Sequence, residues 1–188
     1  MNCFLSGLII LLLFPRVANA QSFEAEVSAG LTASQVSGDN LAGYNKAGFL
    51  GGAGVGFPLG ERWALKTEVF FVQKGSRSME KDSFFFKWSI AYLEIPVLLS
   101  FRFNERFFMD GGLAADLLIS SRTDNGAGWR KTNEGMYAMN PVSVLGLGYK
   151  LSDNLAFKVR HSYSLTRTNL YQNHFNNTIA VYLSLMLK

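Results

Sequence analysis

The sequence predicts an all-β protein, an eight-stranded antiparallel up-and-down transmembrane β-barrel that is closed and has a side-chain-filled polar lumen. Three observations support this fold class. Apolar and polar residues alternate with period two in eight segments, and the connections between the segments are alternately short and long. Charged residues make up 17% of the 188 residues, against about 25% in ordinary soluble domains. The length corresponds to a single domain under a rough prior of 150 residues.

The eight segments are each near the roughly 9–11 residues that a tilted strand needs to cross a bilayer. None of them shows a convincing helical period. They cover residues 23–33, 47–57, 63–74, 88–103, 107–119, 139–151, 155–166 and 177–188.

The connections separate the two rims of the predicted barrel. Three of them are short and contain residue types of tight turns, at 58–62, 104–106 and 152–154. The other four are longer and richer in Gly, Asn, Ser and charge, at 34–46, 75–87, 120–138 and 167–176. Transmembrane barrels have short periplasmic turns and longer extracellular loops. The order of the connections therefore predicts which rim is periplasmic.

Strands of a membrane barrel and of a soluble, lipocalin-like barrel both alternate between apolar and polar residues. The two classes differ in which of these faces points outward. The even-numbered face carries acids and bases whose charges nearly cancel, as a buried network requires. It is also rich in glycine, which leaves room for long side chains in a narrow lumen. Aromatic residues of the odd face lie near both ends of the strands, as at bilayer interfaces. We therefore expect the apolar face to point outward into lipid.

Closure follows from the same assignment, because a lipid-exposed sheet edge would leave backbone groups unsatisfied. With eight strands the interior is just wide enough for side chains to fill. We expect a polar network inside the barrel and no broad aqueous pore. The network residues that we predict are Glu68, Glu94, Arg102, Asp110, Asp116, Lys158 and Arg160.

The N-terminus resembles a signal peptide. An apolar run of about eleven residues, 4–14, has the length of the hydrophobic region of such a peptide. Ala18, Asn19 and Ala20 then form a small-x-small cleavage pattern. We expect cleavage after Ala20, which removes residues 1–20 and leaves 21–188 as one barrel domain. The only cysteine, Cys3, is removed with the peptide.

No residue pattern predicts catalysis, a cofactor or a metal ion. His161 and Ser162 lie on opposite faces of one strand, so they cannot form the nucleophile–base pair of a barrel hydrolase. His174 lies in a loop without a second ligand. The formal charge of +4 is spread along the chain, which argues against nucleic-acid binding.

The longest loop, 120–138, is the best candidate for a binding surface. It carries Trp129, Arg130, Lys131 and Tyr137, residue types that anchor protein interfaces. A basic rim could equally contact outer-membrane lipid and the anionic headgroups of lipopolysaccharide. Both partners, lipopolysaccharide and a protein bound by the extracellular loops, remain open at this point.

Several motifs together resemble those of PorT-like outer-membrane β-barrel domain proteins, often labelled porin family. They are the loop-to-strand transition 37–49, FPL at 57–59, Glu68 with QKG at 73–75, YLEIP at 92–96, GLGY at 146–149 and DNL at 153–155. The resemblance covers nearly the whole predicted mature chain and implies an outer-membrane barrel without shared catalytic residues.

The function predicted from these observations is that of a small, non-enzymatic outer-membrane protein acting through its loops. It would serve as a structural or binding component of the envelope, or as an accessory of a secretion assembly. The alternatives are a narrow solute or ion channel and a soluble exported carrier.

Overall fold

The computed structural model describes residues 23–41, 43–79, 82 and 84–187, and these residues fold into nine antiparallel strands. Eight of the strands are long, and β6 has two residues. Within the described residues no helix is long and apolar enough to cross a membrane. The strands are β1 Glu24–Ser37, β2 Lys46–Pro58, β3 Trp63–Arg77, β4 Lys87–Arg102, β5 Phe107–Asp124, β6 Arg130–Lys131, β7 Met139–Lys150, β8 Leu155–Ser164 and β9 Phe175–Leu187.

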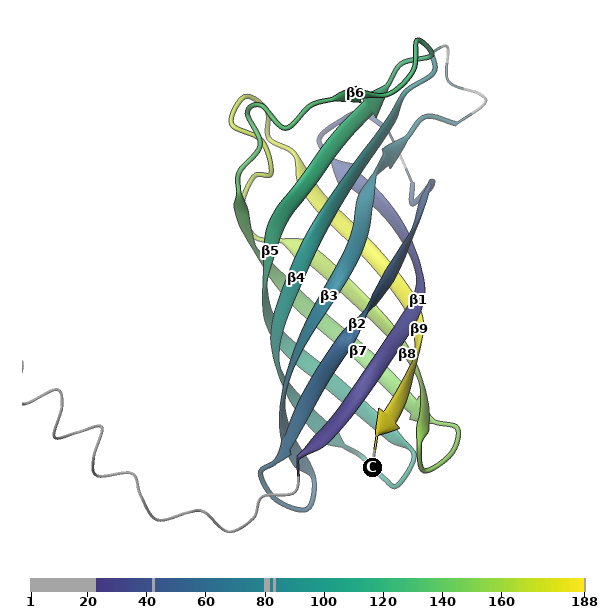
Figure 1. Ribbon diagram of the computed structural model, residues 1–188, viewed down its shortest axis with the longest axis vertical. Helices are drawn as coiled ribbons and strands as arrows, with labels where there is room; N and C mark the ends of the chain where they lie inside the picture. Colours follow the sequence, from purple (N-terminus) through teal and green to yellow (C-terminus); the bar gives the residue numbers. More distant parts are fainter. Residues whose placement is uncertain (1–22, 42, 80–81, 83, 188) are drawn as a thin grey trace, which may run out of the picture.

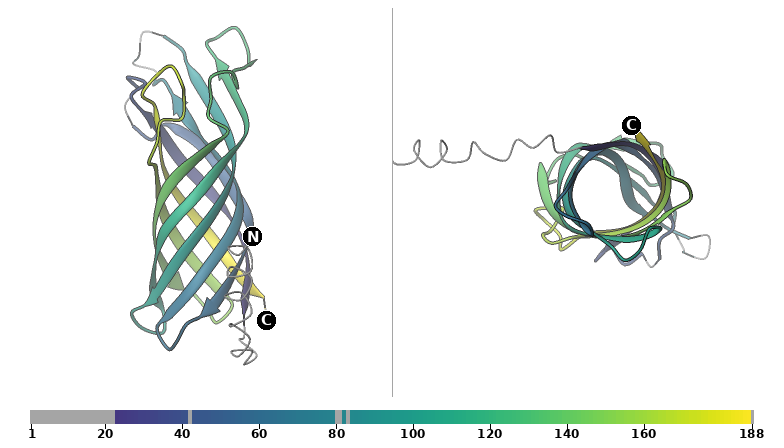
Figure 2. Two further views of the ribbon diagram at one scale, coloured as in Figure 1. Left: turned by 90° about the vertical axis from the view of Figure 1, so that its left-hand side faces the viewer. Right: turned by 90° about the horizontal axis from the view of Figure 1, so that it is seen from below.

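The eight long strands form a closed barrel in which each strand pairs with its neighbours in the chain (Figure 1). The first and last strands, β1 and β9, close it through a continuous register from Ala25 opposite Leu187 to Ser37 opposite Phe175. Viewed along its axis, the barrel is a ring (Figure 2). The predicted all-β, closed, eight-stranded antiparallel fold is therefore confirmed.

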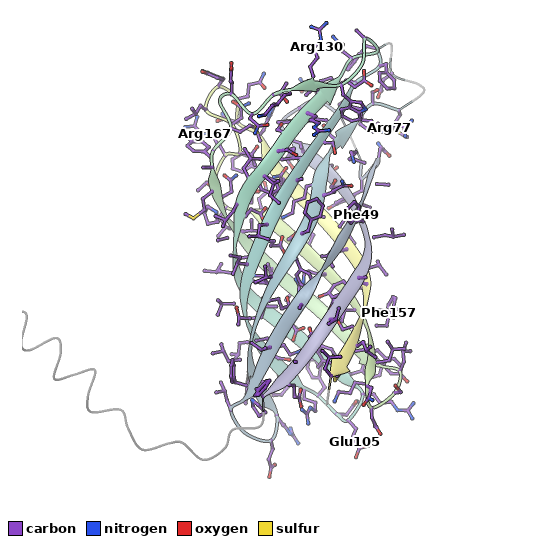
Figure 3. The ribbon with its side chains drawn as sticks, viewed as in Figure 1. Phe49, Arg77, Glu105, Arg130, Phe157 and Arg167 are labelled. Atoms are coloured by element: carbon purple, nitrogen blue, oxygen red, sulfur yellow. The ribbon has the colours of Figure 1, made fainter. Side chains whose placement is uncertain are left out.

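The two rims differ as the connection lengths predict. Three tight turns join the strands at the rim where β1 begins and β9 ends, for example with the amide of Leu59 donating to the carbonyl of Trp63. Glu105 lies at this rim in Figure 3, whereas Arg77, Arg130 and Arg167 lie at the opposite rim with the long loops.

Strands on the loop side are longer than the alternation predicts. β1, β3 and β5 continue to Ser37, Arg77 and Asp124, several residues beyond the predicted ends. Above the lipid band the outward residues become polar, so the hydrophobic period disappears while backbone pairing continues. β6 extends the sheet further by pairing with the upper end of β5.

The apolar face points outward and the charged face inward. Leu31 and Leu147 on the outer wall are 70% and 61% exposed, whereas Glu94 and Arg160 inside the barrel are 1% and 2% exposed. A soluble barrel would have the reverse arrangement, because it must bury its apolar face. The wall is thus suited to hydrocarbon.

One irregularity in β5 reverses which of its residues face into the barrel at the extracellular end. Between β4 and β5 the register shifts at Ala91 and Tyr92, with Ile119 as the extra residue. A bulge of this kind re-aims the side chains that follow it. Beyond it Ser121, an odd-numbered residue, is buried, and Arg122 is exposed. In β5, therefore, even-numbered residues face inward before Ile119, whereas odd-numbered residues face inward after it.

Two adjacent glycines of β5 provide a test of this packing. An added Cβ at Gly112 would collide with the carbonyl oxygen of Val97 and lie 3.0 Å from the Cα of Leu98. At Gly111 the nearest atom would be Leu145 Cδ1, at 4.0 Å. We expect Gly112→Ala to lower the free energy of unfolding by roughly 1–3 kcal/mol and Gly111→Ala to change it little. Urea unfolding in lipid vesicles measures the difference, and equal effects would contradict the packing described.

Candidate functional site

The upper part of the buried ion-pair network is centred on Lys74 of β3. Its Nζ lies 2.7 Å from Glu94 Oε2 and 2.7 Å from Asp116 Oδ2. Glu94 and Asp116 are direct register partners on β4 and β5. Two neighbouring carboxylates repel one another unless a cation lies between them. Lys74 supplies that cation, and all three side chains are almost completely buried.

The middle of the network spans the lumen from one wall to the other. Arg160 of β8 donates from Nη2 to Glu68 Oε2 of β3 at 2.5 Å, and its Nη1 lies 3.7 Å from Glu94 Oε1. Lys158 Nζ lies 2.5 Å from Glu26 Oε1. Because β3 and β8 are not neighbours in the sheet, the Arg160–Glu68 pair ties opposite walls together.

Near the periplasmic end, Lys66 Nζ lies 3.2 Å from Asp110 Oδ1 and 4.4 Å from the centre of the Phe108 ring. Among the described residues the network contains five carboxylates and four cations, so its charges nearly balance. Its members are Glu26, Glu68, Glu94, Asp110 and Asp116 with Lys66, Lys74, Lys158 and Arg160.

Apolar clusters fill the lumen between the charges. One consists of Val36, Trp88, Ile90 and Tyr92 below the extracellular loops. Two others are centred on Phe70 and Leu98. The interior is therefore a mixed core of ion pairs and apolar side chains, and it is less polar than the sequence suggests.

The structure places six of the seven predicted network residues inside the barrel and in ion pairs, and Arg102 outside them. Arg102 is the last residue of β4 and is exposed at the periplasmic mouth. Its register partner on β5 is the buried Phe108, so Arg102 is level with the lowest layer of lumen side chains. Among the described residues it forms none of the ion pairs, and its membership of the network stays a prediction. Glu26 and Lys66 belong to the charged even-numbered face that the sequence predicts, although they are not in the short list of network residues. Sequence reasoning missed Lys74, whose even numbering is the same signal that identified the others.

Three of the four predicted loop-surface residues lie on one hairpin. Arg130 and Lys131 form β6 and are exposed, and the neighbouring Trp129 is 47% exposed. Lys87 Nζ lies 5.2 Å from the centre of the Trp129 ring. Tyr137 is separate: it is half-buried, and its amide donates to the carbonyl of Thr168 in the 165–174 loop.

The strand register gathers further cations beside this hairpin. Arg77 lies opposite Lys87, which in turn lies opposite Asp124, and Arg122 lies opposite Lys131. Directly opposed residues share one face of a sheet. We call Arg77, Lys87, Arg122 and Lys131 the basic rim patch. Among the described residues none of them forms an ion pair, and Asp124 Oδ1 instead accepts from the amides of Gly126 and Gly128.

The two histidines lie apart and contact different groups. His161 is exposed on the outer wall, and its Nε2 lies 2.8 Å from Asn177 Oδ1. His174 lies in the 165–174 loop, where its ring packs edge-on against Trp88. The described part of the chain contains no group of three or more His, Cys, Asp and Glu that could hold a metal ion.

A closed barrel with an apolar wall, a buried charged interior and one elaborated rim defines an integral outer-membrane protein. The chain belongs to the outer membrane protein beta-barrel domain family, whose model matches residues 19–169. Membership in this family indicates the outer membrane as its location.

Solved structures share the fold at low sequence identity. The crystal structure of Ail, the attachment invasion locus protein of Yersinia pestis, has a TM-score of 0.56 and 15% identity, over 87% of this chain and 98% of Ail. A second structure of Ail, in complex with the heparin analogue sucrose octasulfate, has a TM-score of 0.58 and 16% identity, over 88% of this chain and 99% of Ail. Neisserial surface protein A has a TM-score of 0.61 and 12% identity, over 88% of this chain and 99% of that protein. No curated protein matches the chain in sequence.

Removing Lys74 tests the energetic role of the network. Lys74→Met leaves Glu94 and Asp116 buried without their cation, and breaking a buried pair in this way costs about 3–5 kcal/mol. We expect a decrease of that size in the free energy of unfolding, measured with urea in lipid vesicles. Lys150→Met, which removes a lysine at the periplasmic mouth, is the matched control. The double variant Lys74→Met with Asp116→Asn should recover part of the loss, and additive effects of the two changes would contradict the coupling.

Proposed function

We propose that this protein is a non-enzymatic, non-conducting outer-membrane barrel that acts through its extracellular rim. The basic rim patch would bind the phosphate groups of lipopolysaccharide in the surrounding outer leaflet. The observation that carries this proposal is the register of Arg77, Lys87, Arg122 and Lys131. It places four cations without ion-pair partners among the described residues on one outward face.

Like charges directly opposed across strands destabilise a sheet, as at Arg77–Lys87 and Arg122–Lys131. A bound anion removes this repulsion and gains charge-assisted hydrogen bonds from the arginines. The patch therefore has a physical reason to take an anionic partner.

The place of the patch supports lipopolysaccharide as the partner. The outward face of β3, β4 and β5 continues downward into the apolar wall, so we expect a cation at its upper end to lie near the headgroups of the outer leaflet. Trp129, beside Lys87, is of a residue type that is enriched at membrane interfaces. The Ail structure with sucrose octasulfate is an example of a polyanion bound by a barrel of this fold.

The contents of the lumen support a closed barrel over the alternative of a narrow channel. Ion pairs join opposite walls at Arg160 and Glu68, and the Val36–Trp88–Ile90–Tyr92 cluster lies above them. An ion would have to separate buried charge pairs to pass.

Three finer interpretations stay predictions: the resemblance to PorT-like, porin-family proteins, the cleavage of residues 1–20 after Ala20, and a protein partner in an envelope or secretion assembly. The signal peptide lies outside the described residues.

Exchanging two cations of the rim tests lipopolysaccharide binding. The double variant Arg122→Gln with Lys131→Gln removes two charges, each worth about 1 kcal/mol near an anionic surface. We expect about 30-fold weaker binding of phosphorylated lipopolysaccharide core oligosaccharide to the protein in phosphatidylcholine nanodiscs, measured by calorimetry. Arg62→Gln with Arg106→Gln at the periplasmic rim is the control. Equal binding of dephosphorylated core oligosaccharide would overturn the proposal.

Planar-bilayer recording tests the closed lumen. The purified protein should give no steady conductance steps, because the ion pairs and apolar clusters leave no continuous aqueous path. Steady conductance would instead support the channel alternative. If a substitution that fills more of the lumen then abolished this conductance, the lumen would be identified as the ion path.

A further inference from the structure

A pocket of about 470 Å³ lies at the extracellular mouth of the barrel. Segments from all four long loops contribute to it: Asp39 from the first, Phe84 and Phe86 from the second, Glu134 from the third and Gln172 from the fourth. Its volume lies in the range of roughly 300–1,000 Å³ that is usual for small-molecule sites. It is separate from the basic rim patch, whose four residues do not line it.

A buried aromatic side chain contributes to the inner end of the pocket. Trp88 lies at its base and belongs to the buried apolar cluster with Val36, Ile90 and Tyr92. The indole Nε1 of Trp88 donates to Ser121 Oγ at 2.8 Å, which fixes the plane of the ring. Ser121 faces inward because of the β5 bulge described above. The pocket is thus a concave site whose inner end is lined by the Trp88 ring.

Two polar atoms in the wall of the pocket have no hydrogen-bond partner in the part of the chain that the structure describes. His174 is only 7% exposed, and its Nδ1 has no hydrogen-bond partner among the described residues. Asp39 Oδ1 accepts from the amide of Leu41 at 2.9 Å, whereas its Oδ2 is buried without a partner. A buried polar atom without a partner costs free energy that a bound ligand recovers. Burial also lowers the pKa of His174, so its imidazole is neutral at pH 7.

The lining combines three kinds of groups. Phe84, Phe86 and Trp88 offer aromatic surface, and Asp39 and Glu134 offer carboxylates. Four further side chains carry hydroxyl or amide groups that both donate and accept hydrogen bonds: Thr123, Thr132, Asn169 and Gln172. No lysine or arginine is among the described residues that line the pocket, so their charge is opposite to that of the rim beside them.

The geometry points to a binding site for a neutral saccharide in this pocket. A pyranose ring has an apolar face of C–H groups that packs on aromatic rings, and hydroxyls around its edge that donate to carboxylates and exchange hydrogen bonds with amides. An anionic ligand is disfavoured by Asp39 and Glu134. An organic cation would use the aromatic rings and carboxylates but would leave the donors of Thr123, Thr132, Asn169 and Gln172 unused.

Trp88 makes the binding directly measurable. The chain contains three tryptophans, Trp63, Trp88 and Trp129, and the other two are exposed at the rims. In the variant Trp63→Phe with Trp129→Phe, fluorescence reports Trp88 alone. The full chain, purified in lauryl dimethylamine oxide to avoid detergents with sugar headgroups, is titrated with glucose, galactose, mannose, N-acetylglucosamine, maltose and cellobiose. The difference in gel mobility between unheated and heated samples verifies that each variant is folded.

We expect a saturable change of Trp88 fluorescence with at least one of these saccharides. Asp39→Asn keeps the acceptor for the Leu41 amide but removes the charge, and it should weaken binding at least tenfold. Glu105→Gln at the opposite rim should leave saccharide binding unchanged. The double variant Arg122→Gln with Lys131→Gln should also leave it unchanged, which would show that this site is distinct from the basic rim patch.

Three results would overturn the inference. They are the absence of a saturable response to every saccharide up to about 50 mM, unchanged affinity in folded Asp39→Asn, and a tighter response to tetramethylammonium, which would identify a cation site instead. Lipopolysaccharide binding by the rim could fail independently of all three.

Discussion

Backbone hydrogen bonding in hydrocarbon is the constraint on which the rest of this structure depends. A strand edge exposed to lipid would leave its N–H and C=O groups without partners, at several kcal/mol for each group. Pairing of β1 with β9 removes both edges at once. Closure of eight strands also sets the width of the lumen, which is narrow enough for side chains from opposite walls to meet. This narrow width is the reason why side chains, and not a water channel, fill the lumen.

Inside the narrow barrel, charged side chains have no water to solvate them fully, and each must find an opposite charge. Lys74 between Glu94 and Asp116 neutralises two neighbouring strands, and Arg160 with Glu68 connects opposite walls. Removing charges from water is costly, so such pairs do not by themselves make a protein more stable than apolar packing would. Their effect is to penalise any register that separates the partners, and the apolar clusters around Phe70 and Leu98 complete the filling.

Chemical variety is concentrated at the extracellular end. The outer wall there carries cations arranged by strand register, while the described residues that line the mouth of the barrel include acidic and aromatic side chains. The bulge at Ile119 separates these two environments, because beyond it Ser121 is buried beside Trp88, Thr123 lines the pocket and Arg122 is exposed on the outside. One extra residue in β5 thus contributes both to a ligand-sized pocket and to part of a basic surface.

The sequence by itself determined the strands, the order of the rims and the direction of each face, because a period of two is a local property that hydrocarbon and lumen impose on every strand. It identified Glu68, Glu94, Asp110, Asp116, Lys158 and Arg160 by parity. The tertiary structure alone decided which of these residues meet, since Arg160 and Glu68 are 92 positions apart and their contact depends on barrel width and tilt. It also left Arg102 exposed at the periplasmic mouth, opposite Phe108 and outside the ion pairs of the described residues, although its parity is that of the network. The pocket could not be predicted, because its walls come from four loops whose approach is set only when the barrel closes.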